Sequence, residues 1–331
     1  MAHDLDTTDG QTSFASAREH AWHRLGTVLE ESFDAEQAMR EANLGRWNVR
    51  KLPLFAVDYD RPGVSIEVPR NYAIVRDNPV IPGRIDALGV VGGAYKPVQN
   101  EDHAELLNAL VDESGAHFET AGALDGGRKV FLTMRFPESV RVGGVDPVDL
   151  YLAAVNSHDS SMALTFLVTP VRVVCANTLG VALRNASNTF RVRHTSRVEK
   201  VVRSKAREAL GMTFSYLDGF AEEAERMIST SLTDARFEEI IRAEFGAPTD
   251  APDSTLTRSE NKLDVMRRLF AEANTQAGIR NTAWAGFNAV TEYVDHFAPV
   301  RGEDRANRRA EKAVLGSDAF KTRALRAFAP A

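Results

Sequence analysis

"HFETAGALDGGRKVFLTMRF", residues 117–136, carries the strongest local structural signal in the chain. Two runs of alternating side chains flank Asp125-Gly126-Gly127. Aspartate and glycine tolerate the positive φ angles that a tight hairpin turn requires. The stretch therefore predicts a β-hairpin in which residues 118–123 and 128–135 are antiparallel neighbours.

Further short β-like runs lie on both sides of this hairpin. Helical patterns interrupt them: a short helix with Asp34 as its N-cap, and a second helix that starts at Asn100. A third helix is expected to include "NTLGVALRNA", residues 177–186, with Asn177-Thr178 as its cap. The β-like runs are "RWNVRKLPLFAV", "VSIEVP", "NYAIVRD", "ALGVVGGAY", "DLYLAAVNS", "MALTFLVTP" and "TFRVRHT".

The pattern changes to helical at Ser196, which forms a predicted capping box with Glu199. Apolar residues then recur at spacings of three and four as far as Ile228, which predicts one helix from about 197 to 229. Gly211 weakens its interior and marks where it can bend. The segments that follow, "DARFEEIIRAEF", "RSENKLDVMRRLFAEAN" and "TAWAGFNAVTEYVDHF", are also helical in pattern.

These patterns predict an α+β fold, with antiparallel β-hairpins and short helices in the N-terminal portion and a long amphipathic helix followed by a helical C-terminal portion. The expected organisation is a flexible tail at 1–19, a β-rich α+β domain at 20–195 and a helical portion at 196–331. A Pro/Asp-rich linker is expected near 246–256.

Composition excludes several classes of protein. The 331 residues are 44% hydrophobic and 26% charged, as is typical of a globular protein, and no run approaches the roughly 20 apolar residues of a membrane span. The N-terminus lacks the basic-then-apolar order of a secretion signal, so we expect a cytoplasmic protein. The single cysteine, Cys175, excludes an internal disulfide, and its apolar setting favours a buried structural thiol.

Motifs for bound cofactors and metals are absent from the sequence. No glycine pair has the spacing of a nucleotide-binding loop, and no His or Cys pairs have zinc-ligand spacing, so neither a cofactor nor a metal is expected. "NSHDSS", residues 156–161, places His158 beside Asp159, which suggests a general base with a neighbouring carboxylate. A loop whose polar side chains form turn hydrogen bonds explains the same residues.

A concentrated positive charge marks residues 184–207, here called the basic segment. Eight Lys and Arg against one Glu give it a net charge of +7 in a chain of net −6. Alternation places Phe190, Val192 and His194 on one face of a strand, with Arg191, Arg193 and Thr195 on the other. On the following helix, Lys200, Arg203 and Arg207 share a face. These five cations predict a groove that binds phosphates, which Arg172 and Arg184 extend.

Alternatives stay open for each of these residues. The basic face is also compatible with an ordinary solvated surface or with pairing to acids from elsewhere. Arg172, in an otherwise apolar run, reaches a carboxylate or a phosphate or lies on an exposed sheet face. Tyr95 and Phe190 are candidates for stacking on bases, although Phe190 equally suits the core.

The order of five blocks resembles the domain of unknown function 932 family, also called phage/plasmid-like proteins. The blocks lie between about residues 20 and 215 and are "AWHRLGT", "YKPVQNEDHAELLNAL", "ETAGALDGGRKVFLTMRF", "YLAAVNSHDSSMALTFLVTPVRVVCANTL" and "FRVRHT". The resemblance implies a protein carried on phages, prophages or plasmids, and so a bacterial host cell, but brings no catalytic residues. Hairpins followed by a long helix also look like phage single-strand annealing recombinases, a likeness that implies oligomers holding DNA in a basic groove.

The resulting hypothesis is a phage- or plasmid-encoded protein that binds single-stranded DNA or another nucleic acid during replication or recombination, without catalysis and without a membrane. One alternative is an enzyme that acts on a phosphate-containing substrate through residues 156–177, using His158, Asp159 and Arg172. Another is a factor that binds a host protein through the helical portion, which predicts an exposed apolar patch on the C-terminal helices.

Overall fold

The hairpin at residues 117–136 is the centre of the largest sheet. In the computed structural model, which describes residues 5–17, 27–28, 34–172, 177–178, 189–194, 198–299 and 319–330, it is formed by β8 (His117–Leu124) and β9 (Lys129–Val142). Their antiparallel register runs from His117↔Arg135 to Leu124↔Lys129. Asp125, Gly126 and Gly127 adopt φ angles of 54°, 62° and 86°. The predicted hairpin is confirmed, and so is the α+β class.

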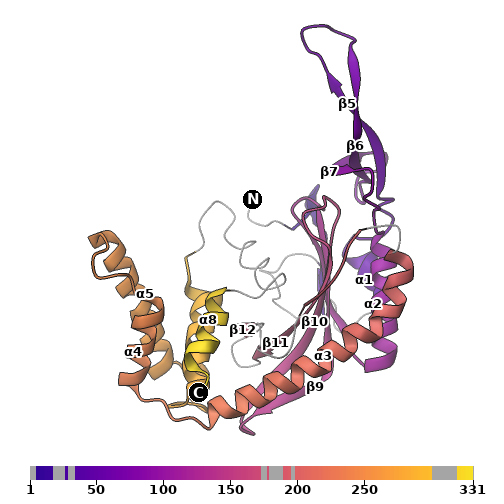
Figure 1. Ribbon diagram of the computed structural model, residues 1–331. Helices are drawn as coiled ribbons and strands as arrows, with labels where there is room; N and C mark the ends of the chain where they lie inside the picture. Colours follow the sequence, from indigo (N-terminus) through magenta and orange to yellow (C-terminus); the bar gives the residue numbers. More distant parts are fainter. Residues whose placement is uncertain are drawn as a thin grey trace. The chain divides into compact units, whose positions relative to one another are not determined.

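The large sheet has the order β12-β11-β10-β9-β8-β3-β4, and β13 also pairs with β11 (Figure 1). β3 and β4 are parallel, whereas the pairs β3–β8, β8–β9, β11–β12 and β11–β13 are antiparallel. The remaining strands are β3 (Phe14–Ser16), β4 (Thr27–Val28), β10 (Asp146–Ser157), β11 (Leu164–Arg172), β12 (Asn177–Thr178) and β13 (Thr189–Val192).

Residues 5–17, expected to belong to a flexible tail, instead form paired strands. β1 (Thr7–Thr8) and β2 (Gln11–Thr12) make a separate two-stranded sheet, whereas β3 joins the large sheet beside β8, with Phe14 opposite Gly122. Phe14 and Ala15 are fully buried. The polar composition of the first 19 residues was misleading, because a three-residue strand with one large apolar side chain needs only a partner to become core.

A second correction concerns Asn177 and Thr178. They form β12, which pairs with the end of β11 through Val171↔Thr178, so both residues are extended and not helical. Local capping preference is weaker than the hydrogen bonds that an adjacent strand supplies. The rest of the predicted helix at 177–186 lies outside the described residues.

A three-stranded antiparallel sheet is formed by β5 (Arg50–Val57), β6 (Ser65–Asp77) and β7 (Ile85–Gly92). β7 pairs only with residues 71–77 of β6. The register of β5 and β6 is interrupted between Pro53↔Tyr72 and Phe55↔Glu67. Beyond this interruption the two strands continue as a two-stranded ribbon that projects past the end of β7 (Figure 1).

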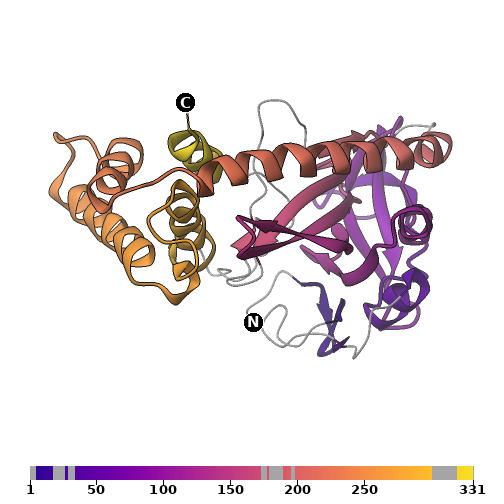
Figure 2. The same ribbon diagram turned by 90° about the horizontal axis from the view of Figure 1, so that it is seen from below.

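The predicted helices of the N-terminal portion form where expected. In α1 (Ala35–Glu41) the Asp34 carboxylate accepts a hydrogen bond from the Gln37 N–H at 2.7 Å. α2 (Asn100–Ser114) ends at Gly115, whose φ of 68° suits a residue without a side chain. α3 (Val198–Ile228) is one continuous helix through Gly211, as Figure 2 shows. Ser196, its predicted cap, lies outside the described residues.

The chain divides into two compact units. The first comprises Met1–Pro137, Leu152–Leu167 and Thr189–Gly211, and the second Glu138–Tyr151, Val168–Asn188 and Met212–Ala331. Both units are discontinuous in sequence. Strands β9, β10 and β11 and helix α3 each contribute residues to both.

The second unit packs helices around α6 (Ala283–Glu292), in which every residue is buried. The Trp284 indole N–H donates to Asp146 Oδ2 at 2.7 Å, across 138 positions of sequence. Phe237 of α4 and Phe270 of α5 stack with ring centroids 4.2 Å apart. The other helices are α4 (Asp234–Phe245), α5 (Asp253–Ala271) and α8 (Ala319–Phe328), with a π-helical turn at Tyr293–Phe297 (η3) after α6.

The first unit contains a buried cation. Arg76 of β6 is only 1% exposed and pairs with Asp6 at 2.6 Å and with Asp86 at 3.2 Å. Its guanidinium lies over the Trp47 ring, 4.1 Å from the centroid. Asp6 precedes β1 and Asp86 lies in β7, so this one side chain ties the N-terminal strands to the three-stranded sheet.

Candidate nucleic-acid interface

β13 carries Arg191, and Arg193 follows directly after the strand, which ends at Val192. β13 pairs with β11 through Leu164↔Val192 and Phe166↔Phe190. Val192 and His194 are buried, whereas Arg191 and Arg193 are exposed. The exposure of residues 191–194 thus alternates as predicted, which places the two arginines on the same side of this extended segment, while Thr195 lies outside the described residues.

Arg191 and Arg193 form no ion pair with any carboxylate in the described part of the chain. Two arginines of the second unit behave differently: the exposed Arg242 and the half-buried Arg267 both pair with Glu238 and Glu260. A cation already neutralised by carboxylates has less to offer a phosphate. Arg191 and Arg193 are therefore the better anion-binding groups.

A third cation, Lys96, lies beside the end of β13. The Lys96 N–H donates to the His194 carbonyl oxygen at 3.4 Å, and the Lys96 side chain is exposed. The sequence shows Lys96 only as an isolated charge in "AYKPVQ", more than ninety positions from β13. We call Arg191, Arg193 and Lys96 the basic edge.

Other members of the predicted groove are only partly described. Lys200, Arg203 and Arg207 lie within α3, and Arg172 is the last residue of β11. The side chains of these four residues, and Arg184 as a whole, fall outside the described parts of the chain. Whether they extend the basic edge therefore remains a prediction.

The stacking candidates both have partners in the protein. Phe190 contacts Phe166 with ring centroids 6.1 Å apart and is half-buried. Tyr95 is buried, stacks on His194 at 4.8 Å and donates its hydroxyl hydrogen to the Ser157 carbonyl oxygen at 2.8 Å. Tyr95 is thus a core residue and is not a platform for bases.

"NSHDSS" forms the turn between β10 and β11. Ser157 Oγ donates to the Met162 carbonyl oxygen at 2.9 Å, and the Asp159 carboxylate accepts from the Ser161 N–H at 2.9 Å. His158 is fully buried, with Nε2 3.0 Å from Asn100 Oδ1. Burial, and the proximity of His194 and His103, lower the pKa of His158 to about 3. A substrate at the surface does not reach this imidazole, and the geometry is that of a turn.

His103, His158 and His194 together form a buried histidine cluster in the first unit. Neither ring nitrogen of His103 or of His194 has a hydrogen-bond partner among the described atoms, and Nδ1 of His158 also lacks one. Burial and the nearby His194 lower the pKa of His103 to about 3. Within the described residues, no group of three or more His, Cys, Asp or Glu side chains is arranged to hold a metal ion.

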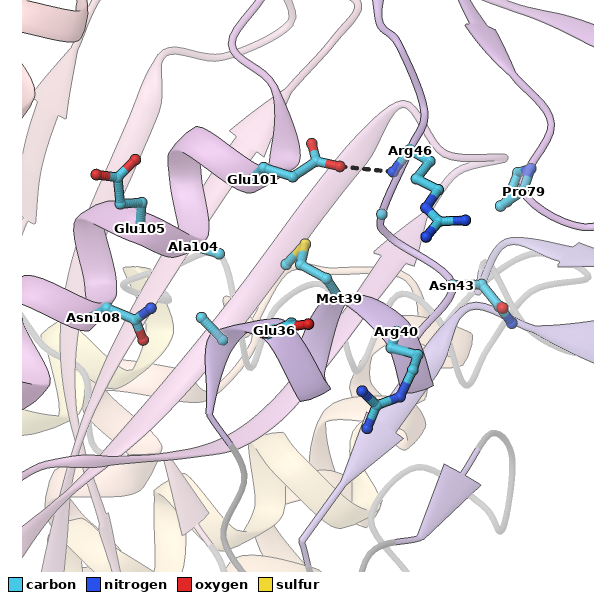
Figure 3. A pocket seen from close by; sticks show the side chains of 12 residues that line it. Glu36, Met39, Arg40, Asn43, Arg46, Pro79, Glu101, Ala104, Glu105 and Asn108 are labelled. Carbon is cyan, nitrogen blue, oxygen red and sulfur yellow. Dashed lines mark hydrogen bonds between the residues drawn. The ribbon is translucent and has the colours of Figure 1, made fainter.

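A pocket of about 700 Å³ lies between α1 and α2 in the first unit (Figure 3). Met39, Ala104 and Pro79 contribute its apolar lining. The charged groups around it are mixed, because Glu36, Glu101 and Glu105 line it together with Arg40 and Arg46. Glu101 Oε1 is already committed to the Arg46 backbone N–H, at 2.6 Å. This mixture of charges does not select one class of ligand.

Comparison with known proteins places most of the chain in one family. Residues 87–315 match the family model described as "Domain of unknown function (DUF932)". No curated protein and no solved structure matches the chain. Among the helices in the described ranges, none combines the length and the apolar character needed to cross a membrane.

Proposed function

Because this chain belongs to the DUF932 family, whose description carries no activity, we infer its function from the residues on its surface. We propose that it binds nucleic acid, in the first place single-stranded DNA, through the basic edge and without catalysis. The contacts are to phosphates, so binding is independent of base sequence. The phage- or plasmid-borne setting implied by the sequence resemblance makes replication or recombination the process that such binding serves.

One observation carries this proposal: Arg191 in β13 and Arg193 directly after it are exposed on the same side of one extended segment and pair with no described carboxylate. Residues two positions apart on a strand are roughly 7 Å apart. Neighbouring phosphates along one DNA strand are separated by a comparable distance. The two guanidinium groups are therefore spaced to contact one backbone at two points.

The charge of the whole chain makes this binding local and sensitive to salt. The basic segment carries +7, so the remainder of the chain carries −13 and repels a polyanion. Attraction is confined to distances of about one Debye length, roughly 10 Å at 0.1 M salt. We therefore expect binding at low ionic strength that weakens steeply as salt is added.

Fluorescence anisotropy with labelled single-stranded and duplex oligonucleotides, at about 50 and about 200 mM salt, tests this function. Arg191→Ala/Arg193→Ala removes two phosphate contacts and is therefore expected to reduce the slope of log affinity against log salt concentration by about 1.4 on single strands. The matched control is Arg258→Ala/Arg268→Ala, which removes the same charge from two exposed positions of α5 where neither arginine forms an ion pair with a described residue.

Equal weakening in both double variants means that net charge alone sets the affinity, and the assignment to β13 is then wrong. Wild-type protein that binds neither oligonucleotide at the lower salt concentration removes the proposed function altogether. Tighter binding of the duplex than of the single strand keeps the basic edge but overturns the preference for single-stranded DNA.

A further inference from the structure

Exposed apolar side chains are concentrated on one sheet of the first unit. Eleven large hydrophobic residues are exposed in the described part of the chain, and only Val145, Phe214 and Phe297 lie outside the three-stranded sheet. The other eight lie on β5, β6, β7 and the turn between β5 and β6: Leu52, Phe55, Val57, Tyr59, Val64, Ile66, Ile85 and Val90. We call residues 50–77, which form the β5–β6 hairpin, the arm.

The outer part of the arm has apolar side chains on both faces. Ala56↔Ile66 and Val57↔Ser65 are consecutive cross-strand pairs, so Ile66 and Val57 point to opposite faces. Ile66 is 63% exposed, Phe55 53% and Tyr59, in the turn, 91%. An isolated two-stranded hairpin is marginally stable in water, and this one has no third strand beyond residue 71 of β6. Its apolar side chains are therefore suited to burial against a partner.

The arm exposes more apolar surface than scattered surface residues do. Six of the eight residues lie on it, each 38–91% exposed, and together they present several hundred Å² on its two faces. An exposed apolar area of that size is typical of a surface that binds a partner.

Charge along the arm identifies the partner. Its outer half carries Asp60 and Glu67, both exposed, and its inner half carries Lys51, with the exposed Arg70 at the interruption between the two halves. The exposed Arg61 of the outer half is neutralised by Asp58. Asp60, Glu67, Lys51 and Arg70 form no ion pair with another described residue. Lys51 is held by the Gly93 carbonyl oxygen at 2.9 Å and lies over the Tyr72 ring. An arm with one acidic end and one basic end is complementary to a copy of itself that runs in the opposite direction.

We propose that the arm binds the arm of a second copy of this chain, antiparallel to it, in a dimer with two-fold symmetry. Such an interface is isologous, so each residue pair occurs twice and the acidic outer end of each arm meets the basic inner end of the other. The contact covers one face of each arm, the face that carries the exposed Phe55 and Val57. The inference is independent of nucleic-acid binding, since no residue of the basic edge lies on the arm.

Sedimentation velocity of the full-length protein, over a hundredfold range of concentration and without nucleic acid, tests the proposal. Wild-type protein is expected to shift from the mass of one chain to that of two as its concentration rises. Phe55→Ser/Val57→Thr, which removes two apolar groups from the face in contact, is expected to raise the dissociation constant of the dimer at least about tenfold. Val145→Thr/Phe297→Ser, which removes exposed apolar groups elsewhere, is the matched control and leaves that constant unchanged.

Charge reversal separates pairing of arms from unspecific stickiness. Asp60→Lys/Glu67→Lys makes both ends of the arm basic, and Lys51→Glu/Arg70→Glu makes both ends acidic. Each variant alone is expected to remain monomeric, because like charges then meet along the whole contact. An equimolar mixture of the two is expected to restore a two-chain species, which a change confined to folding does not do.

Several results overturn the proposal. One such result is a wild-type protein that is still a monomer at about 100 μM, a concentration at which standard interfaces are saturated. Another is a wild-type mass greater than that of two chains. Dimers that persist in Phe55→Ser/Val57→Thr, or a charge-reversed mixture that stays monomeric, place the contact elsewhere. A wild-type monomer that sediments with phospholipid vesicles assigns the arm to a lipid surface instead.

Discussion

Acidification is expected to destabilise the first unit through its buried histidines. His103 and His158 are fully buried, and burial with the proximity of neighbouring imidazoles lowers the pKa of each from 6.5 to about 3. Between these values the unfolded chain binds two protons that the folded chain excludes. Stability is therefore complete above the unfolded pKa and falls as the pH drops from 6.5 towards 3. The pKa of His194 is lowered as well, by burial, and acts in the same direction.

The size of the effect follows from linkage. At about pH 5.5, one unit below the unfolded pKa, each histidine lowers the free energy of unfolding by about 1.4 kcal/mol relative to about pH 7.5. His103 and His158 together therefore account for about 3 kcal/mol, a large part of the 5–15 kcal/mol of a typical protein. Carboxylates contribute little in this range, since Asp77 and Asp86 have pKa values below their ordinary 3.8.

Urea unfolding at the two pH values measures this loss. Trp22→Phe/Trp284→Phe leaves Trp47 as the single indole, and Trp47 is buried 5.8 Å from the His158 ring, so its fluorescence reports on the first unit. His103→Leu is expected to remove about half of the pH-dependent loss. At about pH 7.5 it costs little, because neither ring nitrogen of His103 has a partner in the described structure. Equal stability at both pH values, or an undiminished pH effect in His103→Leu, refutes the reasoning.

Two further predictions concern the contacts of Arg76. Gly127→Ala is expected to lower the free energy of unfolding by about 2–4 kcal/mol, because φ there is 86° and the added Cβ atom would clash with Arg76 Nη1. The control Gly126→Ala, with φ 62° and nothing within 4 Å of its Cβ atom, is expected to lower it by about 1 kcal/mol. Equal urea midpoints for the two variants contradict this prediction. Arg76→Met leaves the Asp6 and Asp86 carboxylates without their shared cation and is expected to lower stability by about 3–5 kcal/mol. A loss below about 1 kcal/mol in the same assay shows that the ion pairs contribute little.

Local features of the sequence were enough to predict several elements of the fold. The turn at Asp125-Gly126-Gly127, the Asp34 cap of α1 and the apolar spacing of α3 depend on contacts within a few residues, and all three form as expected. The alternation around Arg191 and Arg193 is local in the same sense. Such patterns are readable because backbone geometry repeats with a fixed period in helices and strands.

Long-range pairing was beyond the reach of those patterns. β3 becomes part of the large sheet because Phe14 lies opposite Gly122, more than a hundred positions away. β12 exists because Val171 and Thr178 pair across a reversal of the chain. Nothing within the first nineteen residues distinguishes a three-residue core strand from a tail, since the partner that buries it is not a neighbour in sequence.

The clearest contrast is between two arginines in similar surroundings. In "AIVRD" and "FRVRH", Arg76 and Arg193 both occupy short β-forming runs, and the sequence by itself determined only that each lies in an extended segment. Tertiary structure decided that Arg76 is enclosed by Asp6, Asp86 and Trp47, while Arg193 remains at the surface. Burying a guanidinium requires carboxylates brought from distant parts of the chain, so whether an arginine stabilises the core or is free to bind an anion is settled only when those parts meet.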